Sequence, residues 1–333
     1  MRPRMMWAVY GMLCAAGLLW LMNPAEAQPT ADQVLTAAGL SADDKQRVLN
    51  GEFVTADANA VSDRDLAVSM AFLVKTSPDA LSRQVVAGSL ITSDAQVQSY
   101  SMFKNPGSLA DLAGLRIPSD EAKALFGAKA GSALNLSAAE IAAFNAVPGG
   151  SQQAVQQQLQ QMLLRRYQAY RASGLGGIAP YARGGGSDND LSADLRKATE
   201  AAQNLEKYQP KFHAVLLGYP KGMAPEVQEN FFWLRSIIHG KPTYVLQQTL
   251  AVADGAARAV AQRQFYVSTG YNGEQAVAGF LPVSGGTLVV YSSHAFTDQV
   301  SGFGGSMKRS IGSRVMADQL KKMFEAGRTK AAP

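Results

Sequence analysis

Five strand-like runs near the end of this chain constrain its fold more than any other feature. They cover residues 231–238, 243–252, 258–268, 275–281 and 287–294, and together they are rich in β-branched, aromatic and other apolar side chains. The turns between the first three are His239-Gly240-Lys241-Pro242 and Ala253-Asp254-Gly255-Ala256. Because connections this short join antiparallel neighbours, the pattern predicts an antiparallel sheet.

Further strands are expected near the N-terminus, at residues 52–55, 66–74 and 96–102. Between the second and third of these, Ser77 and Pro78 are typical of the cap and first residue of a helix, which we expect to end at Gly88. These N-terminal strands, in residues 28–107, are expected to join the sheet formed by residues 221–328.

Residues 108–220 differ from both flanking segments because they are rich in Ala, Gln and Leu and poor in β-branched residues. Helices are expected at 152–172 and 192–208, with a glycine-rich linker at 183–190 between them. No Lys-Ser or Lys-Thr follows Gly184-Gly185-Gly186, so a flexible linker is favoured over a phosphate-binding loop. We interpret this block as a helical insertion.

A final amphipathic helix is expected at residues 307–326. It would direct Ile311, Val315, Leu320, Met323 and Phe324 toward the core, and Lys308, Arg309, Lys321 and Lys322 toward solvent. The predicted fold class is therefore α+β, with a curved antiparallel sheet packed on a long C-terminal helix and a helical insertion.

The N-terminus has the pattern of a secretory signal peptide. Arg2 and Arg4 precede an apolar run at residues 5–22, and Ala25-Glu26-Ala27 is a small-residue cleavage site. Cleavage after Ala27 would place the protein in the periplasm or outside the cell, although an uncleaved anchor is the alternative reading. The only cysteine, Cys14, would be lost, which excludes disulfides and thiolate chemistry in the mature chain.

Residues 53–74, 242–267, 287–300 and 307–324 together resemble the helix-grip arrangement of the START-like (SRPBCC) superfamily. That resemblance implies an apolar cavity between the sheet and the C-terminal helix, holding a lipid or an aromatic small molecule.

Polar side chains within apolar strand rows are the candidate ligand-binding residues. These are Arg235 beside Trp233, Gln248, Arg263 and, at the end of the last strand, His294. A buried polar group must be paired or it destabilises the fold, so each either has a structural partner or contacts a ligand. Arg263 with Phe265 and Gln264 with Tyr266 alternate, and periodicity does not decide which pair faces inward.

Catalysis is the second reading, with His294 as an acid or base of an exported hydrolase or isomerase, because Ser293 and Asp298 are near it in sequence. Ser293 and His294 nevertheless point to opposite strand faces, and no Gly-x-Ser-x-Gly motif is present. No catalytic residue is assigned.

Neither a metal nor another cofactor is expected, because His-x-x-x-His pairs are missing and Asp188-Asn189-Asp190 lacks the rest of a calcium loop. Arg165, Arg166, Arg171 and Arg183, with the basic final helix, suggest contact with an anionic membrane surface rather than with nucleic acid. We therefore expect an exported, non-enzymatic carrier of an apolar ligand. A cell-envelope protein-interaction module is the third reading.

Overall fold

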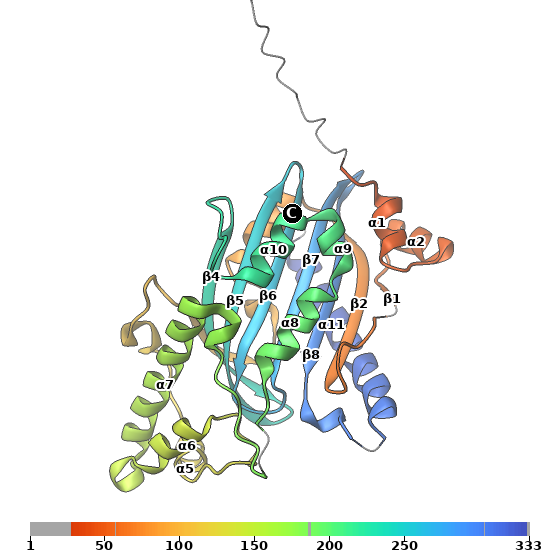
Figure 1. Cartoon of the computed structure of the whole chain (residues 1–333). Helices are drawn as coiled ribbons and strands as arrows, with labels where there is room; N and C mark the ends of the chain where they lie inside the picture. The colour runs from red at the N-terminus through yellow and green to blue at the C-terminus, as the bar shows by residue number, and fades with distance from the viewer. Residues whose placement is uncertain (1–27, 57, 186–187, 303, 332–333) are drawn as a thin grey trace, which may run out of the picture.

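The computed structural model describes residues 28–56, 58–185, 188–302 and 304–331. The predicted signal peptide lies outside these residues. Within them the chain forms one sheet with helices on both faces (Figure 1).

Eight antiparallel strands form a curved, unclosed sheet in the order β1-β2-β8-β7-β6-β5-β4-β3. The five C-terminal strands run as consecutive antiparallel neighbours, as the short turns predict: β4 (Gln228–Ile238), β5 (Lys241–Asp254), β6 (Ala257–Val267), β7 (Gly273–Val283) and β8 (Gly286–Phe296). At one edge β2 (Asp65–Val74) pairs with β8 and carries β1 (Val54–Ala56) outside it. At the other edge β3 (Val97–Met102) pairs with β4.

Two helices cross the sheet between its opposite edges. The chain leaves β2, forms α3 (Pro78–Val86) and α4 (Ser89–Ser93), and then enters β3. The predicted helix start is confirmed, because Ser77 Oγ accepts a hydrogen bond from the Ala80 N–H at 3.2 Å and Pro78 occupies the first turn. Gly88 adopts φ +89°, which lets the chain turn directly from α3 into α4.

The helical insertion covers one face of the sheet (Figure 1). It contains α5 (Ser119–Phe126), α6 (Ala138–Asn145), α7 (Gln152–Ser173), α8 (Leu191–Glu200), α9 (Gln203–Tyr208) and α10 (Pro210–Gly218). The single helix expected at 192–208 is thus two helices, and α10 follows them with His213 buried. Near β1, β2 and β8, the short helices α1 (Ala31–Ala37) and α2 (Ala42–Leu49) cover the same face.

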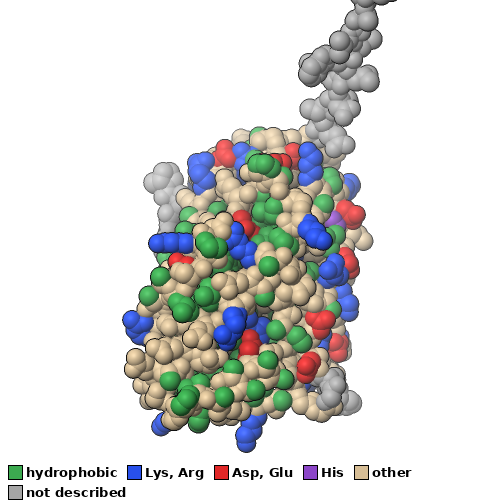
Figure 2. Space-filling view, turned by 60° about the vertical axis from the view of Figure 1, so that its left-hand side comes forward, with side chains coloured by type: hydrophobic (Ala, Val, Ile, Leu, Met, Phe, Trp, Pro, Cys, Tyr) green, Lys and Arg blue, Asp and Glu red, His purple; other side chains and the backbone are tan. Residues whose placement is uncertain are grey.

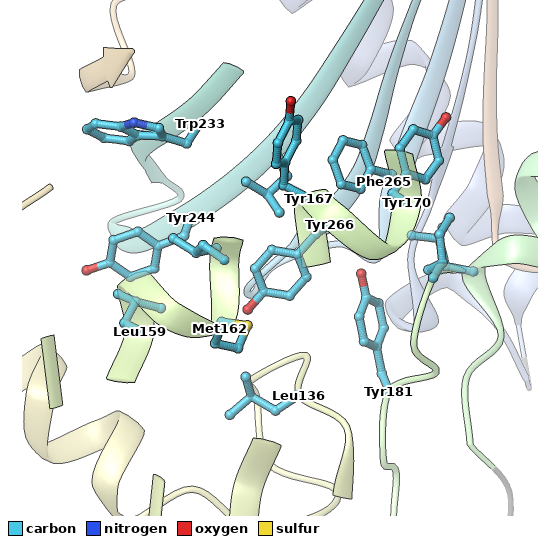
Figure 3. Packing of buried hydrophobic residues seen from close by; sticks show 14 of the residues in the cluster. Leu136, Leu159, Met162, Tyr167, Tyr170, Tyr181, Trp233, Tyr244, Phe265 and Tyr266 are labelled. Atoms are coloured by element: carbon cyan, nitrogen blue, oxygen red, sulfur yellow. The ribbon is translucent and has the colours of Figure 1, made fainter. Parts of the chain in front are cut away.

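Aromatic packing joins α7 to the sheet (Figure 3). The rings of Tyr170 and Phe265 stack with centroids 4.0 Å apart and planes 7° apart. Trp233 on β4 is buried and donates its indole N–H to the Asp111 carbonyl at 2.7 Å. Since the insertion and the sheet share this core, the insertion forms a structural layer of the fold rather than a loop appended to it.

The opposite face is covered by α3, α4 and α11 (Gly305–Ala331). Phe324 is buried and Leu320 and Met323 pack beside it, as predicted. The prediction is wrong for Ile311 and Val315, which are 58% and 49% exposed. The first half of α11 instead approaches β2 through Gly312, where a Cβ would lie 2.7 Å from the Leu66 side chain.

Candidate ligand cavity and the polar clusters of the sheet

A cavity of about 360 Å³ lies between the sheet and the layer formed by α3, α4 and α11. This volume is within the range of small-molecule binding sites. Most of its lining is apolar. The lining side chains include Phe72, Val74, Leu81, Val85, Leu90, Val260, Ala276, Ala278, Phe280, Val289, Tyr291 and Phe324.

Aromatic rings in contact with one another form one end of the cavity. Phe72 on β2 packs against Phe53 at 4.5 Å and against Phe324 of α11 at 5.0 Å between ring centroids. Arg328 also lines this end, where its guanidinium lies 4.5 Å from the centroid of the Phe53 ring and donates to the Gly51 carbonyl at 2.9 Å. This end therefore carries a positive charge over an aromatic wall.

Uncharged polar side chains form the other end. Gln262 of β6 lines the cavity and pairs with Ala276 of β7. Ala276 lies four residues before Phe280 on β7, which is about 14 Å along the strand. Directly opposite Gln262 on β5 is Thr249, whose hydroxyl is fully buried and has no hydrogen-bond partner in the part of the chain that the structure describes. Unpaired polar groups at this depth are uncommon in native proteins.

A half-buried carboxyl group lies next to this polar end. Glu274 Oε1 accepts a hydrogen bond from Ser293 Oγ at 2.6 Å, and Ser293 lies two residues beyond cavity-lining Tyr291 on β8. Burial raises the pKa of Glu274, and the nearby Asp94 raises it further. Burial, together with the charge of Glu274, also raises the pKa of Tyr291. The low polarity of this region thus disfavours a negative charge in it.

The structure places the five predicted ligand-binding residues on the opposite face of the sheet, toward the helical insertion. Gln248, Arg263 and His294 lie in one transverse row, joined by Gln275 between the last two. Trp233 and Arg235 follow on the same face of β4. The expectation that they contact a ligand between the sheet and the C-terminal helix does not match this placement.

Protein partners account for the polar groups in that row. Buried Arg263 donates to Gln275 Oε1 at 2.6 and 2.9 Å, to Tyr170 Oη at 3.0 Å and to the Leu216 carbonyl at 3.1 Å. Gln248 accepts from Tyr170 Oη at 2.7 Å and donates to Glu229 at 2.6 Å. These contacts cross-link the sheet to α7 and α10, which is the structural role that the sequence left open.

Arg235 forms an ion pair with Glu121 of α5, and Tyr244 Oη donates to the other oxygen of the same carboxylate. Burial, followed by the Glu121 carboxylate, raises the pKa of Tyr244. Arg235 and Tyr244 thus hold α5 against the β4–β5 hairpin.

Gln262 lines the cavity but was not among the residues predicted from the sequence. The pattern that identified Arg235 and Gln248, a polar side chain within a strand row, also applies to Gln262. It is a polar residue in the row Val260, Gln262, Gln264 of a strand. The other missed contact is Asp65, whose carboxylate pairs with His294 and which begins a strand 229 residues earlier in the chain.

No known family model, curated protein or solved structure matches this chain. Within the described ranges there is no helix long and apolar enough to cross a membrane, nor any cluster of three or more His, Cys, Asp or Glu side chains suited to a metal ion.

Two of the four arginines in the predicted cluster form ion pairs within the protein. Arg166 is buried, with its guanidinium 2.6 Å from Glu140, and Arg183 pairs with Asp298 at 2.7 Å. On the side of the molecule that carries α7, Figure 2 shows Lys and Arg side chains dispersed among acidic and neutral ones. An extended basic surface of the kind that binds nucleic acid is not seen on that side.

Proposed function

We propose that this protein binds an apolar small molecule or lipid in the cavity between the sheet and α11, and that it acts as a carrier or receptor rather than as an enzyme. The observation that carries the proposal is the apolar, partly open cavity of about 360 Å³. A curved sheet holding a long C-terminal helix is also the arrangement of the START-like superfamily, which supports this choice.

The lining of the cavity narrows the chemistry of the ligand. Gln262 provides an uncharged hydrogen-bonding group at the polar end of the cavity, with the unpaired hydroxyl of buried Thr249 next to it on β5, and burial disfavours ionisation of nearby Glu274. A ligand with an apolar body and one uncharged polar group, such as an alcohol, ester or amide, satisfies both features. An anionic group would be accommodated only at the Arg328 end.

The exported hydrolase or isomerase is a weaker proposal in this geometry. His294 lies on the face of the sheet opposite the cavity, and its Nδ1 is held by buried Asp65. Chemistry at His294 would need a substrate site on the insertion face. The interaction-module proposal would use the helical insertion as the binding surface. The apolar residues of α7 are, however, buried in the core of the fold.

The cavity can be filled by one substitution. Ala278→Phe adds a ring to the lining, so it is expected to abolish binding of the uncharged fluorescent probe N-phenyl-1-naphthylamine to the chain starting at Gln28, which retains every described element. Ala142→Phe, on an exposed position of α6, is the matched control and should bind as the parent does.

Mass spectrometry under native conditions gives the complementary test on protein isolated from its own cells. A co-purified hydrophobic molecule that is lost in the Ala278→Phe variant supports the proposal. Absence of bound small molecules together with no probe binding by the parent protein contradicts it.

A further inference from the structure

The first half of α11 carries an exposed apolar row that the fold leaves uncovered. Met307, Ile311 and Val315 are 71%, 58% and 49% exposed and follow one another at intervals of four residues. Successive members of such a row are displaced by only about 40° around a helix, so the three side chains share one face. Buried Phe324 of the same helix lies about 140° away from Ile311 around the helix axis, so the row lies on the side of α11 away from the core.

Basic side chains border the row. Lys308, Arg314, Lys321 and Lys322 are all exposed, and Asp318 is the exposed acidic residue among them. The residues of α11 include seven Lys or Arg and two Asp or Glu. The excess of five equals the formal net charge of the whole chain, +5, so the remainder of the chain is neutral overall. The helix that has the exposed apolar row thus accounts for the net positive charge of the chain.

We infer that the N-terminal half of α11 docks on an anionic phospholipid surface, with Met307, Ile311 and Val315 in the headgroup region and the flanking Lys and Arg side chains on lipid phosphates. An apolar row bordered by basic residues on a helix that cannot span a bilayer is the pattern of an interfacial helix. Lys and Arg side chains have long apolar stems, so they can reach phosphates while the row is buried.

Charge argues against a second copy of this chain as the occupant. A symmetric dimer through the row would place Lys308 and Arg314 of one copy near the same residues of the other, and like charges at such an interface are repelled. An anionic lipid surface complements the row and its basic border at the same time. This inference does not depend on ligand binding in the cavity, because the row lies on the outer side of α11.

Vesicle co-sedimentation of the chain starting at Gln28 tests the inference. We expect binding to vesicles of phosphatidylcholine with phosphatidylglycerol, weak binding to phosphatidylcholine alone, and release by added salt. Ile311→Ser should weaken binding about tenfold or more through lost apolar burial. Lys308→Gln and Arg314→Gln should each weaken it about fivefold.

Leu49→Ser is the matched control, since Leu49 of α2 is exposed to a similar extent, 47%, but has no place in the row. All these positions are exposed, so unchanged melting temperatures are expected and would show that the variants fold. Equal binding by Ile311→Ser and the parent would overturn the inference. A parent dimer that becomes monomeric with Ile311→Ser would also overturn it, in favour of self-association.

Discussion

The carboxylate of Asp65 lies 2.8 Å from Nδ1 of His294 and joins the first residue of β2 to the end of β8. Asp65 is fully buried, and the same oxygen also accepts the Val61 N–H at 2.8 Å. Its second oxygen has no hydrogen-bond partner among the described residues. His294 is therefore a structural partner of a carboxylate that is already incompletely satisfied.

Replacing His294 should destabilise the fold. His294→Ala removes one of the two partners of the buried Asp65 oxygen, and we expect the free energy of unfolding to fall by about 1–3 kcal/mol. In a double-mutant cycle measured by urea unfolding, Asp65→Asn should reduce the cost of His294→Ala. Strictly additive losses would show that the two side chains are not coupled.

Arg263 is predicted to be among the most sensitive positions of the sheet. Arg263→Met removes the donor to the buried Leu216 carbonyl and leaves Gln275 Oε1 with Thr199 Oγ1 alone, so a loss of about 2–4 kcal/mol is expected in urea unfolding. Arg83→Met, on the exposed side of α3, is the control and should change stability by less than about 0.5 kcal/mol. A similarly small effect at Arg263 would mean that the buried network adds little.

Glu274 should make the protein less stable as the pH rises. Its pKa is raised in the folded state because burial disfavours the carboxylate, so the folded protein keeps this proton to a higher pH than the unfolded chain does. The stabilisation that Glu274 provides is therefore fully present below its pKa in the unfolded chain, about 4.3. It is lost as the pH rises through the pKa of Glu274 in the folded protein. Glu274→Gln should flatten this dependence in unfolding free energies measured from pH 4 to 7. The exposed Asp318→Asn should leave it unchanged.

Gln262 should control the preference of the cavity for a polar group. Displacement of N-phenyl-1-naphthylamine by 1-decanol and by decane separates the polar and apolar parts of binding. In Gln262→Leu we expect the affinity for 1-decanol to fall about threefold to tenfold, the value of one hydrogen bond, with no loss of affinity for decane. Thr249→Val should act in the same direction.

Two other results of that experiment have distinct meanings. Equal losses of affinity for 1-decanol and for decane in Gln262→Leu would show that the hydroxyl group of 1-decanol binds elsewhere, for example at Arg328. Failure of both ligands to displace the probe would instead count against the apolar-ligand proposal itself.

Local sequence signals predicted the elements of the sheet well. Each of the five C-terminal runs is a strand, because alternating apolar residues and tight turns act within a few residues of one another. The start of α3 was equally clear, since Ser77 and Pro78 satisfy helix-start chemistry without any distant contact.

The directions of the β6 side chains could not be predicted from residue periodicity, because the pairing of β6 with β5 contains a bulge. The pairing with β5 shifts between Leu246 and Gln247, so that Phe265 is left as an extra residue. Such a bulge places neighbours on one face, and Phe265 and Tyr266 both point toward the helical insertion (Figure 3). Arg263 points to the same side, where it donates to Tyr170 Oη of α7. Strict alternation would have separated Phe265 from Tyr266.

The sequence by itself determined the α+β class, the antiparallel strands and the long basic helix at the C-terminus, because these follow from residue periodicity and turn chemistry. Only the tertiary structure decided which face of the sheet each polar residue occupies. The insertion took one face and paired Arg263, Gln248 and His294 there, while α11 took the other and left a cavity beside Gln262. That choice depends on packing between segments far apart in the chain, which exposes Ile311 and Val315 and buries Phe324 on the same helix.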